Sequence, residues 1–243
     1  MEIIAEMKRV FTEKFGREAE AAYFSPGRVN LIGEHTDYNG GHVFPCAISL
    51  GTYAVAAKRS DAQVRLYSMN ITKAGIVTVP SAQGLSYEAA HDWANYPLGV
   101  IRMLEEAGYP VSTGLDIVFY GTLPNGAGLS SSASIEVLMA VILDDMFGWG
   151  LDRITLVKLA QKAENKFVGV NCGIMDQFAV GMGKTDCAIL LDCNTLEYRY
   201  SKLDLQDCSI VITNTNKKHS LGASKYNERR SQCVSALAQL QKV

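Results

Sequence analysis

A glycine-rich turn that runs into a row of serines could bind a phosphate. The turn covers residues 126–129 and the serines fall within 130–134, between a strand-like stretch and a long apolar segment. Free backbone N–H groups and the positive end of the dipole favour a phosphate at a helix start, and glycines let the backbone approach it closely. Serine hydroxyls can add hydrogen bonds or a Mg²⁺ ligand. No Lys-Ser or Lys-Thr pair follows, so this is not a Walker loop, and a serine-capped core helix explains the spacing equally well.

A second segment, residues 26–41, combines polar and apolar side chains in a way that favours a binding site. Arg28, Glu34, His35 and Asp37 surround apolar residues. Apolar residues in such a setting indicate a wall that is anchored to the core and presents polar groups into a cleft. Sugar hydroxyls need polar groups in fixed directions, and an unpaired group discriminates strongly between isomers. The alternative is a surface loop with internal salt bridges, which the composition disfavours.

Two carboxylates form the third candidate for chemistry. Glu164 comes late on a predicted helix, where its charge opposes the dipole. Asp176 falls in the first turn of the next element, where an aspartate alone is most simply a helix-start residue. Near a phosphate-binding turn, however, two carboxylates can divide the work, one on Mg²⁺ and the other close to an acceptor hydroxyl.

The elements that must position these motifs alternate irregularly between helices and strands. Helices are predicted over residues 4–15, 93–106, from the serine row to about 147, 152–167, 174–182 and 224–243. Strands are predicted at 21–25, two or three within 43–68, then 76–79, 115–120, 187–192, 197–200 and 209–213. Asp92 and Asp152 are the expected N-caps of their helices, and residues 26–41 match neither period. Without regular βαβ alternation the predicted fold class is α+β.

The composition excludes several classes of protein. The chain has 243 residues, of which 48% are hydrophobic and 20% charged, as in ordinary globular domains. Its net charge of -2 gives no electrostatic case for nucleic acid or an anionic membrane. The longest strongly apolar run, 137–143, is too short to span a bilayer, and no secretory signal is expected. Six cysteines without a C-x-x-C pair predict reduced thiols in a cytoplasmic protein.

Taken together, the three motifs resemble the galactokinases of the GHMP small-molecule kinase family. Residues 26–38 are similar to the galactokinase signature, 126–134 to the phosphate loop of the family, and 173–177 to the segment that carries its catalytic aspartate. The first motif is highly specific, whereas the second is shared with mevalonate and homoserine kinases. The resemblance runs over nearly the whole chain.

The resemblance implies a domain organisation. Residues 1–190 would form a GHMP-kinase-type N-terminal domain, a mixed sheet packed with helices, with a sugar-binding segment at about 10–58 and a phosphate loop at 124–134. Residues 191–243 would begin a second α+β domain. Members of the family are longer and carry a third, C-terminal glycine-rich motif. Because no such motif follows Gly183, we expect a chain truncated at its C-terminal end, whose own activity stays open.

The resemblance also implies an activity. This is the ATP-dependent phosphorylation of D-galactose at its anomeric hydroxyl, giving galactose 1-phosphate and ADP, the first committed step of galactose catabolism. The cofactors would be ATP and Mg²⁺. We expect a cytoplasmic monomer that acts on small molecules, without a nucleic-acid or membrane partner.

By the same resemblance, individual residues receive roles. The catalytic residues would be Asp176 as the base and Arg28 beside it. The sugar would be held by Glu34, His35, Thr36, Asp37, Gly173 and Tyr226. ATP would be bound by Gly126, Ala127, Gly128, Leu129, Ser130, Ser131, Ser132 and Trp93, and Mg²⁺ by Ser132 and Glu164. These roles suit phosphoryl transfer, in which a protein mostly positions groups and neutralises charge.

Three alternatives remain open on the sequence. A related sugar 1-kinase would act on N-acetylgalactosamine, arabinose or galacturonate. A non-catalytic sensor would bind galactose and ATP, but it should have lost part of the serine loop or Asp176, and both are intact. A glycosidase that uses Glu34 and Asp37 as its carboxylate pair would leave the phosphate turn without a purpose.

Overall fold

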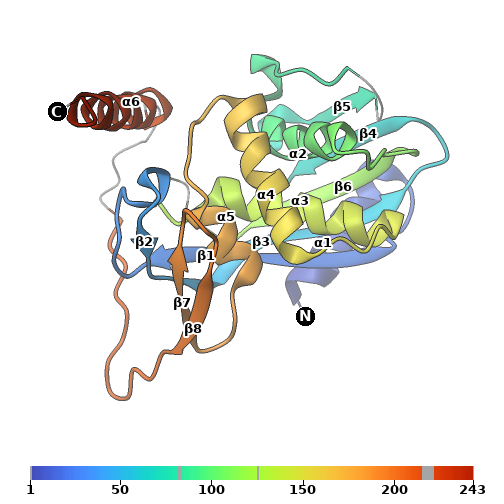
Figure 1. The fold of residues 1–243 in the computed structure, drawn as a ribbon. Coiled ribbons are helices and arrows are strands. Elements are labelled where there is room, and N and C mark those ends of the chain that lie inside the picture. Colours follow the sequence, from blue (N-terminus) through green and yellow to red (C-terminus); the bar gives the residue numbers. More distant parts are fainter. Residues whose placement is uncertain (1, 81–83, 125, 215–221, 243) are drawn as a thin grey trace.

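One mixed sheet organises the computed structural model, which describes residues 2–80, 84–124, 126–214 and 222–242 (Figure 1). In these ranges the sheet has eight strands. They are β1 (Ala21–Asn30), β2 (His42–Val43), β3 (Pro45–Lys58), β4 (Gln63–Ser68), β5 (Ile76–Pro80), β6 (Leu115–Gly121), β7 (Cys187–Asp192) and β8 (Tyr198–Lys202). The order is β2-β7-β3-β6-β4-β5, with β1 paired to β3 and β8 to β7. Only the β4–β6 pair is parallel among these strands, so the predicted α+β class is confirmed.

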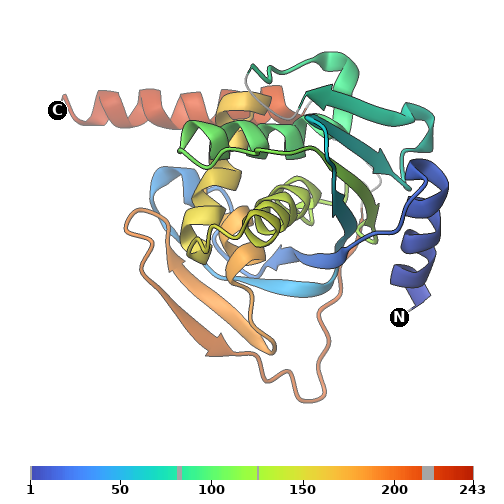
Figure 2. The same ribbon diagram turned by 90° about the vertical axis from the view of Figure 1, so that its right-hand side faces the viewer.

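Helices cover both faces of the sheet. The helices are α1 (Glu2–Phe15), α2 (Asn95–Glu106), α3 (Ser131–Phe147), α4 (Arg153–Ala163), α5 (Met175–Met182) and α6 (Gly222–Leu240). Along β3, Ala54 and Ala56 pack with α2, α3 and α4, whereas Val55 and Ala57 pack with α1. This alternation follows from the two-residue period of a strand. Figure 2 accordingly shows α1 on the side of the sheet away from α2 and α3.

Helix α3 is the central helix of the larger core. Leu138, Met139, Ile142 and Leu143 are fully buried in the cluster that α3 shares with α2 and α4. A helix that is apolar nearly all round must be buried, as the sequence predicted. The turn before α3, which the sequence suggests could bind a phosphate, is therefore attached to a rigid element.

Helix α6 projects from the end of the molecule that carries β2 (Figure 1). It contacts the turn before α5: Nδ2 of Asn227 donates to the Gly169 carbonyl at 3.1 Å, and Arg230 donates to the Asn171 carbonyl at 2.6 Å. These bonds bring Tyr226 next to the 26–41 segment.

The predicted elements are found, with four differences. Residues 26–30 extend β1 and are not a loop. The register against β3 shifts between Pro26 and Arg28, and this bulge conceals the strand from a two-residue period. Residues 209–213 form no strand, because no neighbouring strand in the described part of the chain pairs with them.

The other two differences concern helix ends. Asp92 does not cap α2: it sits at φ 45° and ψ -118° inside a 3-10 segment, η3 (Ala89–Ala94), and α2 begins only at Asn95. The helix predicted to run to residue 167 ends at Ala163 and passes into a π-type turn, η4 (Glu164–Val168). Asp152 does cap α4, where it accepts from the Thr155 N–H at 3.0 Å.

None of the helices in the described ranges is both long enough and apolar enough to traverse a lipid bilayer.

Candidate active site

The three sequence motifs meet at the carboxylate of Asp176. Asp176 lies in the first turn of α5. Its Oδ1 accepts from Nε of Arg28, on β1, at 2.9 Å and forms an ion pair with Nη2 of Arg28 at 2.8 Å, and its Oδ2 accepts from the Ser130 hydroxyl at 2.6 Å. Nη1 of Arg28 donates to the Gly128 carbonyl at 2.6 Å. One hydrogen-bonded network therefore joins the polar segment, the serine row and the third motif.

The turn before α3 is fastened to β1. The Arg28 N–H donates to the Leu129 carbonyl at 3.2 Å. A side chain at Gly27 would collide with this turn, because a Cβ there would lie 2.8 Å from the same carbonyl oxygen. Gly126 and Gly128 have φ values of 68° and 70°, which glycine adopts freely. Asn125, within the predicted 124–134 loop, lies outside the described residues.

The serines of this row are not ordinary helix caps. Ser130 precedes α3 with left-handed backbone angles, and its side chain makes no capping bond. The Ser134 hydroxyl is buried and donates to the Ser25 carbonyl or to Oγ1 of Thr52, both at 2.9 Å. The first N–H groups of α3 are thus left without a side-chain cap from Ser130, as an anion-binding helix start requires.

Two buried carboxyl groups, those of Glu136 and Glu164, lie near Asp176. Nε2 of Gln177 donates to Glu164 at 2.6 Å and to Glu136 at 3.0 Å. Burial and the charge of Asp176 raise the pKa of Glu164 to about 7, although a hydrogen bond from Ser132 opposes this shift. Burial and the charge of Glu164 raise the pKa of Glu136 well above its usual range. Ser132 and Glu164, which the family resemblance assigns to one metal ion, are therefore neighbours.

The polar segment places Asp37 beside Asp176. Asp37 is only 9% exposed. Burial raises the pKa of Asp37; a backbone hydrogen bond from Tyr38 opposes the shift, and the charge of Asp176 adds to it. Gly173 fits against this carboxylate, since a Cβ at residue 173 would collide with Oδ2 of Asp37. Gly173 is therefore required by the close approach of the two segments.

The remaining sugar-segment residues form an aromatic and polar rim. Nδ1 of His35 and the Tyr38 hydroxyl are 2.5 Å apart, and the Tyr226 ring lies 6.0 Å from His35 and 5.2 Å from Tyr38. Oε1 of Glu34 accepts from Asn30 at 2.8 Å.

Thr36 points elsewhere. Its hydroxyl lies 2.8 Å from the carbonyl oxygens of both Gly33 and His42, and a hydroxyl has one proton to donate. The Thr36 side chain therefore closes the loop on itself.

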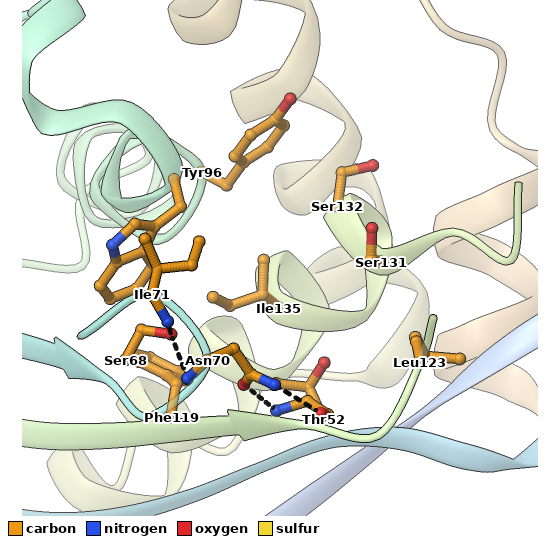
Figure 3. A pocket seen from close by; sticks show the side chains of 12 residues that line it. Thr52, Ser68, Asn70, Ile71, Tyr96, Phe119, Leu123, Ser131, Ser132 and Ile135 are labelled. Atoms are coloured by element: carbon orange, nitrogen blue, oxygen red, sulfur yellow. Dashed lines mark hydrogen bonds between the residues drawn. The ribbon is translucent and has the colours of Figure 1, made fainter. Parts of the chain in front are cut away.

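A cavity of about 180 Å³ opens beside the serine row (Figure 3). Its lining comprises Thr52, Ser68, Asn70, Ile71, Trp93, Tyr96, Phe119, Gly121, Leu123, Ser131, Ser132 and Ile135. Trp93 is therefore adjacent to the predicted phosphate site, and its ring packs edge-on against Phe119 with centroids 5.8 Å apart. An apolar cavity of this kind suits a flat heteroaromatic ring.

Sequence analysis gave no role to several residues of this region, among them Glu136, Gln177, Tyr96 and Phe119. For Glu136 a signal existed, because it is an ionisable residue within the apolar part of a helix, and a fully buried carboxyl needs a partner. Tyr96 and Phe119 gave no signal distinct from core residues.

Two family models match the chain. The galactokinase galactose-binding signature matches residues 9–58, and the GHMP kinases N terminal domain matches residues 95–184. The first model includes Arg28, and the second includes the serine row and Asp176. The two matched segments are thus those that the Asp176 network connects.

Curated relatives match over essentially the whole chain. The galactokinase of Clostridium beijerinckii is 59% identical over 243 residues, which are 100% of this chain and 62% of the relative. The galactokinase of Bacillus subtilis is 57% identical over 238 residues, which are 98% of this chain and 61% of the relative. The chain thus spans about 62% of the length of the curated relatives it matches.

Solved structures agree in fold. The crystal structure of Lactococcus lactis galactokinase complexed with galactose matches with a TM-score of 0.93 and 45% identity, covering 99% of this chain and 62% of that one. Methanococcus jannaschii mevalonate kinase matches with a TM-score of 0.68 at 17% identity, covering 93% of this chain and 74% of that one, and so shares the fold alone. Because both family models and the highly identical relatives agree, the chain belongs to the galactokinase family of GHMP kinases.

Proposed function

We propose that the protein phosphorylates D-galactose at its anomeric hydroxyl, with ATP as the phosphoryl donor, to give galactose 1-phosphate and ADP. The observation that carries this proposal is the Asp176 network, which links Arg28 of the galactose-signature segment to Ser130 of the phosphate loop. A phosphoryl acceptor and donor must meet in line at one point, and Asp176 is where the two segments meet. The names of the relatives and the galactose in the Lactococcus structure support the choice of sugar.

In this proposal Asp176 accepts a hydrogen bond from the anomeric hydroxyl and takes or orients its proton. Arg28, 12% exposed at its side chain, stabilises negative charge on the transferring group or on Asp176. Glu34, His35, Asp37, Gly173 and Tyr226 hold the sugar hydroxyls. The Thr36 hydroxyl, which faces two backbone carbonyls, shapes the loop for them.

The other half of the site would receive the nucleotide. Backbone N–H groups of residues 126–132 surround its phosphates, and the start of α3 contributes the positive end of its dipole. The cavity that includes Trp93 accommodates the adenine. The placement of the phosphates and that of the adenine both fit the position of the serine row, which lies between the cavity and Asp176.

Ser132 and Glu164 are suited to hold Mg²⁺. A hydroxyl and a carboxylate are the oxygen ligands that this ion prefers. The raised pKa of Glu164, caused by burial and by the charge of Asp176, means that its surroundings do not stabilise its negative charge, which a bound cation would do. When bound, Mg²⁺ neutralises phosphate charge in the donor.

We further propose the organisation of the chain. Residues 1–190 form the N-terminal domain and 191–243 begin a second one, with β8 still paired to β7 of the first sheet. The six free cysteines support a cytoplasmic location, and we propose that the enzyme is a monomer acting on small molecules.

A coupled ADP-release assay tests the proposed function. The assay compares galactose, N-acetylgalactosamine, arabinose and galacturonate. It uses this chain and a chimera that continues it with the C-terminal remainder of the Clostridium beijerinckii relative. We expect the chimera to release ADP in proportion to the amount of galactose supplied. Release with another sugar alone would reassign the substrate, and tight galactose binding without release would favour a sensor.

A further inference from the structure

Ser130 has an unusual backbone conformation for a serine before a helix. Its φ and ψ are 60° and 50°, in the left-handed region, which non-glycine residues adopt only at a cost. A serine in this position normally turns its oxygen to the N–H groups of the helix, but the Ser130 side chain makes no such bond. The residue is 7% exposed, so its hydroxyl is committed to a contact inside the protein.

That contact is with Asp176. Arg28 and Ser130 together hold the Asp176 carboxylate from two sides, and we call this arrangement a clamp. The Ser130 hydroxyl donates to Oδ2 at 2.6 Å, whereas Oδ1 accepts a hydrogen bond from Nε of Arg28 and lies 2.8 Å from Nη2 of the same guanidinium. The rotation of the carboxylate is therefore fixed from both sides. A hydrogen bond from a hydroxyl to a carboxylate at this distance is among the stronger ones in proteins.

The clamp also connects to the phosphate loop. Arg28 donates to the Gly128 carbonyl and Ser130 directly precedes α3, so both residues that hold Asp176 are tied to the loop. A hydroxyl has one proton. While Ser130 donates it to Asp176, the hydroxyl has no proton for a nucleotide phosphate.

We propose that the Ser130 side chain is a positioning residue for Asp176, and that only the backbone of Ser130 serves the nucleotide. Through this bond the orientation of Asp176 depends on the conformation of the phosphate loop. The inference rests on the proposed function and assigns this hydroxyl to the acceptor side of the reaction. It predicts an effect on turnover and not on nucleotide binding.

Two substitutions separate the hydroxyl from the backbone. Ser130→Ala removes the hydroxyl and keeps the cost of the left-handed conformation. Ser130→Gly removes the hydroxyl as well, but glycine adopts this conformation freely. If the hydroxyl positions Asp176, both variants of the chimera lose kcat by about 10- to 100-fold, the range expected when a reacting group is misplaced. Their KM for ATP and their galactose affinity, measured by calorimetry, stay within about twofold.

A matched control removes the same kind of bond elsewhere. The Tyr23 hydroxyl donates to Asp145 at 2.6 Å, away from Asp176, so Tyr23→Phe should leave kcat unchanged. Thermal unfolding of every variant establishes that the protein is folded. If Ser130→Ala fails to fold, the Gly variant, whose backbone is unstrained, carries the test alone.

Three results would overturn the inference. Turnover like that of the wild type in either folded variant would show that the hydroxyl is dispensable. A loss in the Ala variant that the Gly variant restores would assign the effect to the backbone. A higher KM for ATP with retained kcat would place the hydroxyl on the nucleotide. Each of these three results requires that the wild-type chimera is active. An inactive wild-type chimera would instead contradict the proposed function, so the two failures can be distinguished.

Discussion

Glu136 and Glu164 share one hydrogen-bond donor, Nε2 of Gln177, although both carboxyls are buried. Two carboxyl groups that lie so close in a low-dielectric interior disfavour double ionisation. The pKa of Glu136 is accordingly raised, mainly by burial and to a smaller extent by the charge of Glu164. This pair is part of the folded protein whether or not a metal ion is bound, and it makes the stability depend on pH.

The first prediction concerns Glu136→Gln. The folded state holds the Glu136 proton at pH values where the unfolded chain, with an ordinary pKa near 4.5, has released it. Stability therefore falls as the pH rises above about 4.5. An amide cannot ionise, so the stability of the variant relative to the wild type should increase as the pH is raised from 5 to 8. Urea unfolding without divalent ions measures this, and parallel pH curves would contradict it.

The second prediction concerns Asp116, which is fully buried in β6. It accepts from Arg65 at 2.6 Å, from Arg17 at 2.9 Å and from Arg59 at 3.1 Å. Burial alone would raise the pKa of Asp116, but the hydrogen bonds from Arg65 and Arg17 and the arginine charges outweigh it and lower the pKa. Its contribution to stability is thus present above the unfolded pKa near 3.8 and is lost as the pH falls through the lower folded value.

Asp116→Asn should destabilise the protein at pH 7 by about 3 to 5 kcal/mol, because it leaves the partly buried Arg17 and Arg65 without their counter-charge. The matched control is Asp61→Asn. The exposed carboxylate of Asp61 also pairs with Arg59, which Asp116 would still neutralise in that variant, and a pair with an exposed partner contributes about 1 kcal/mol or less. Denaturant unfolding of both variants gives the comparison. Equal losses would show that the arginine cluster adds nothing specific.

Much of the fold could be predicted because its elements carry strong local periods. Helix α3 is apolar nearly all round, and the helix found at Met175–Met182 follows the predicted one within a residue. The failures have tertiary causes. The second half of β1 is a strand because β3 lies beside it across a bulge, and residues 209–213 have strand-like composition but no partner in the described chain.

The candidate site could be located from its motifs, but the hydrogen bonds that connect these motifs could not be predicted. Nothing in the spacing of Arg28, Ser130 and Asp176 says that one hydroxyl and one guanidinium hold opposite oxygens of the same carboxylate. A serine-capped helix was one of two equally supported interpretations of the serine row, whereas the Ser130 side chain, on a left-handed backbone, makes no capping bond. Such geometry depends on loop conformation, which local residue types do not determine.

The third prediction concerns Ser132→Ala. Ser132 hydrogen-bonds to buried Glu164 and lines the cavity beside the phosphate loop. Its loss should raise the KM for Mg·ATP in the chimera by about tenfold, the equivalent of one charge-assisted hydrogen bond, while galactose affinity is retained. Titration with Mn²⁺ in the presence of nucleotide checks metal binding directly. Unchanged nucleotide and metal affinity would reduce Ser132 to a residue of the helix start.

The fourth prediction separates binding of the sugar from its turnover. Asp176→Ala should abolish ADP release in the chimera, because no other carboxylate is clamped between Arg28 and the phosphate loop in the described structure. Galactose should still bind, since Asp37 and the rim around His35 are intact. Calorimetry measures the binding and the coupled assay the turnover. Substantial turnover in this variant would remove Asp176 from the mechanism.

The fifth prediction uses the tight contact between Gly173 and Asp37. A methyl group on residue 173 has no room, because it would overlap the Asp37 carboxylate, so Gly173→Ala must push Asp37 or its own segment aside. If Asp37 holds the sugar, galactose affinity should fall by about tenfold or more, since a misdirected buried acceptor loses its hydrogen bond. Nucleotide affinity should be unchanged, because the cavity beside the serine row does not include residue 173. Calorimetric titration with each substrate distinguishes these effects, and a parallel loss of both affinities would mean that the variant has disrupted the fold instead of the sugar site.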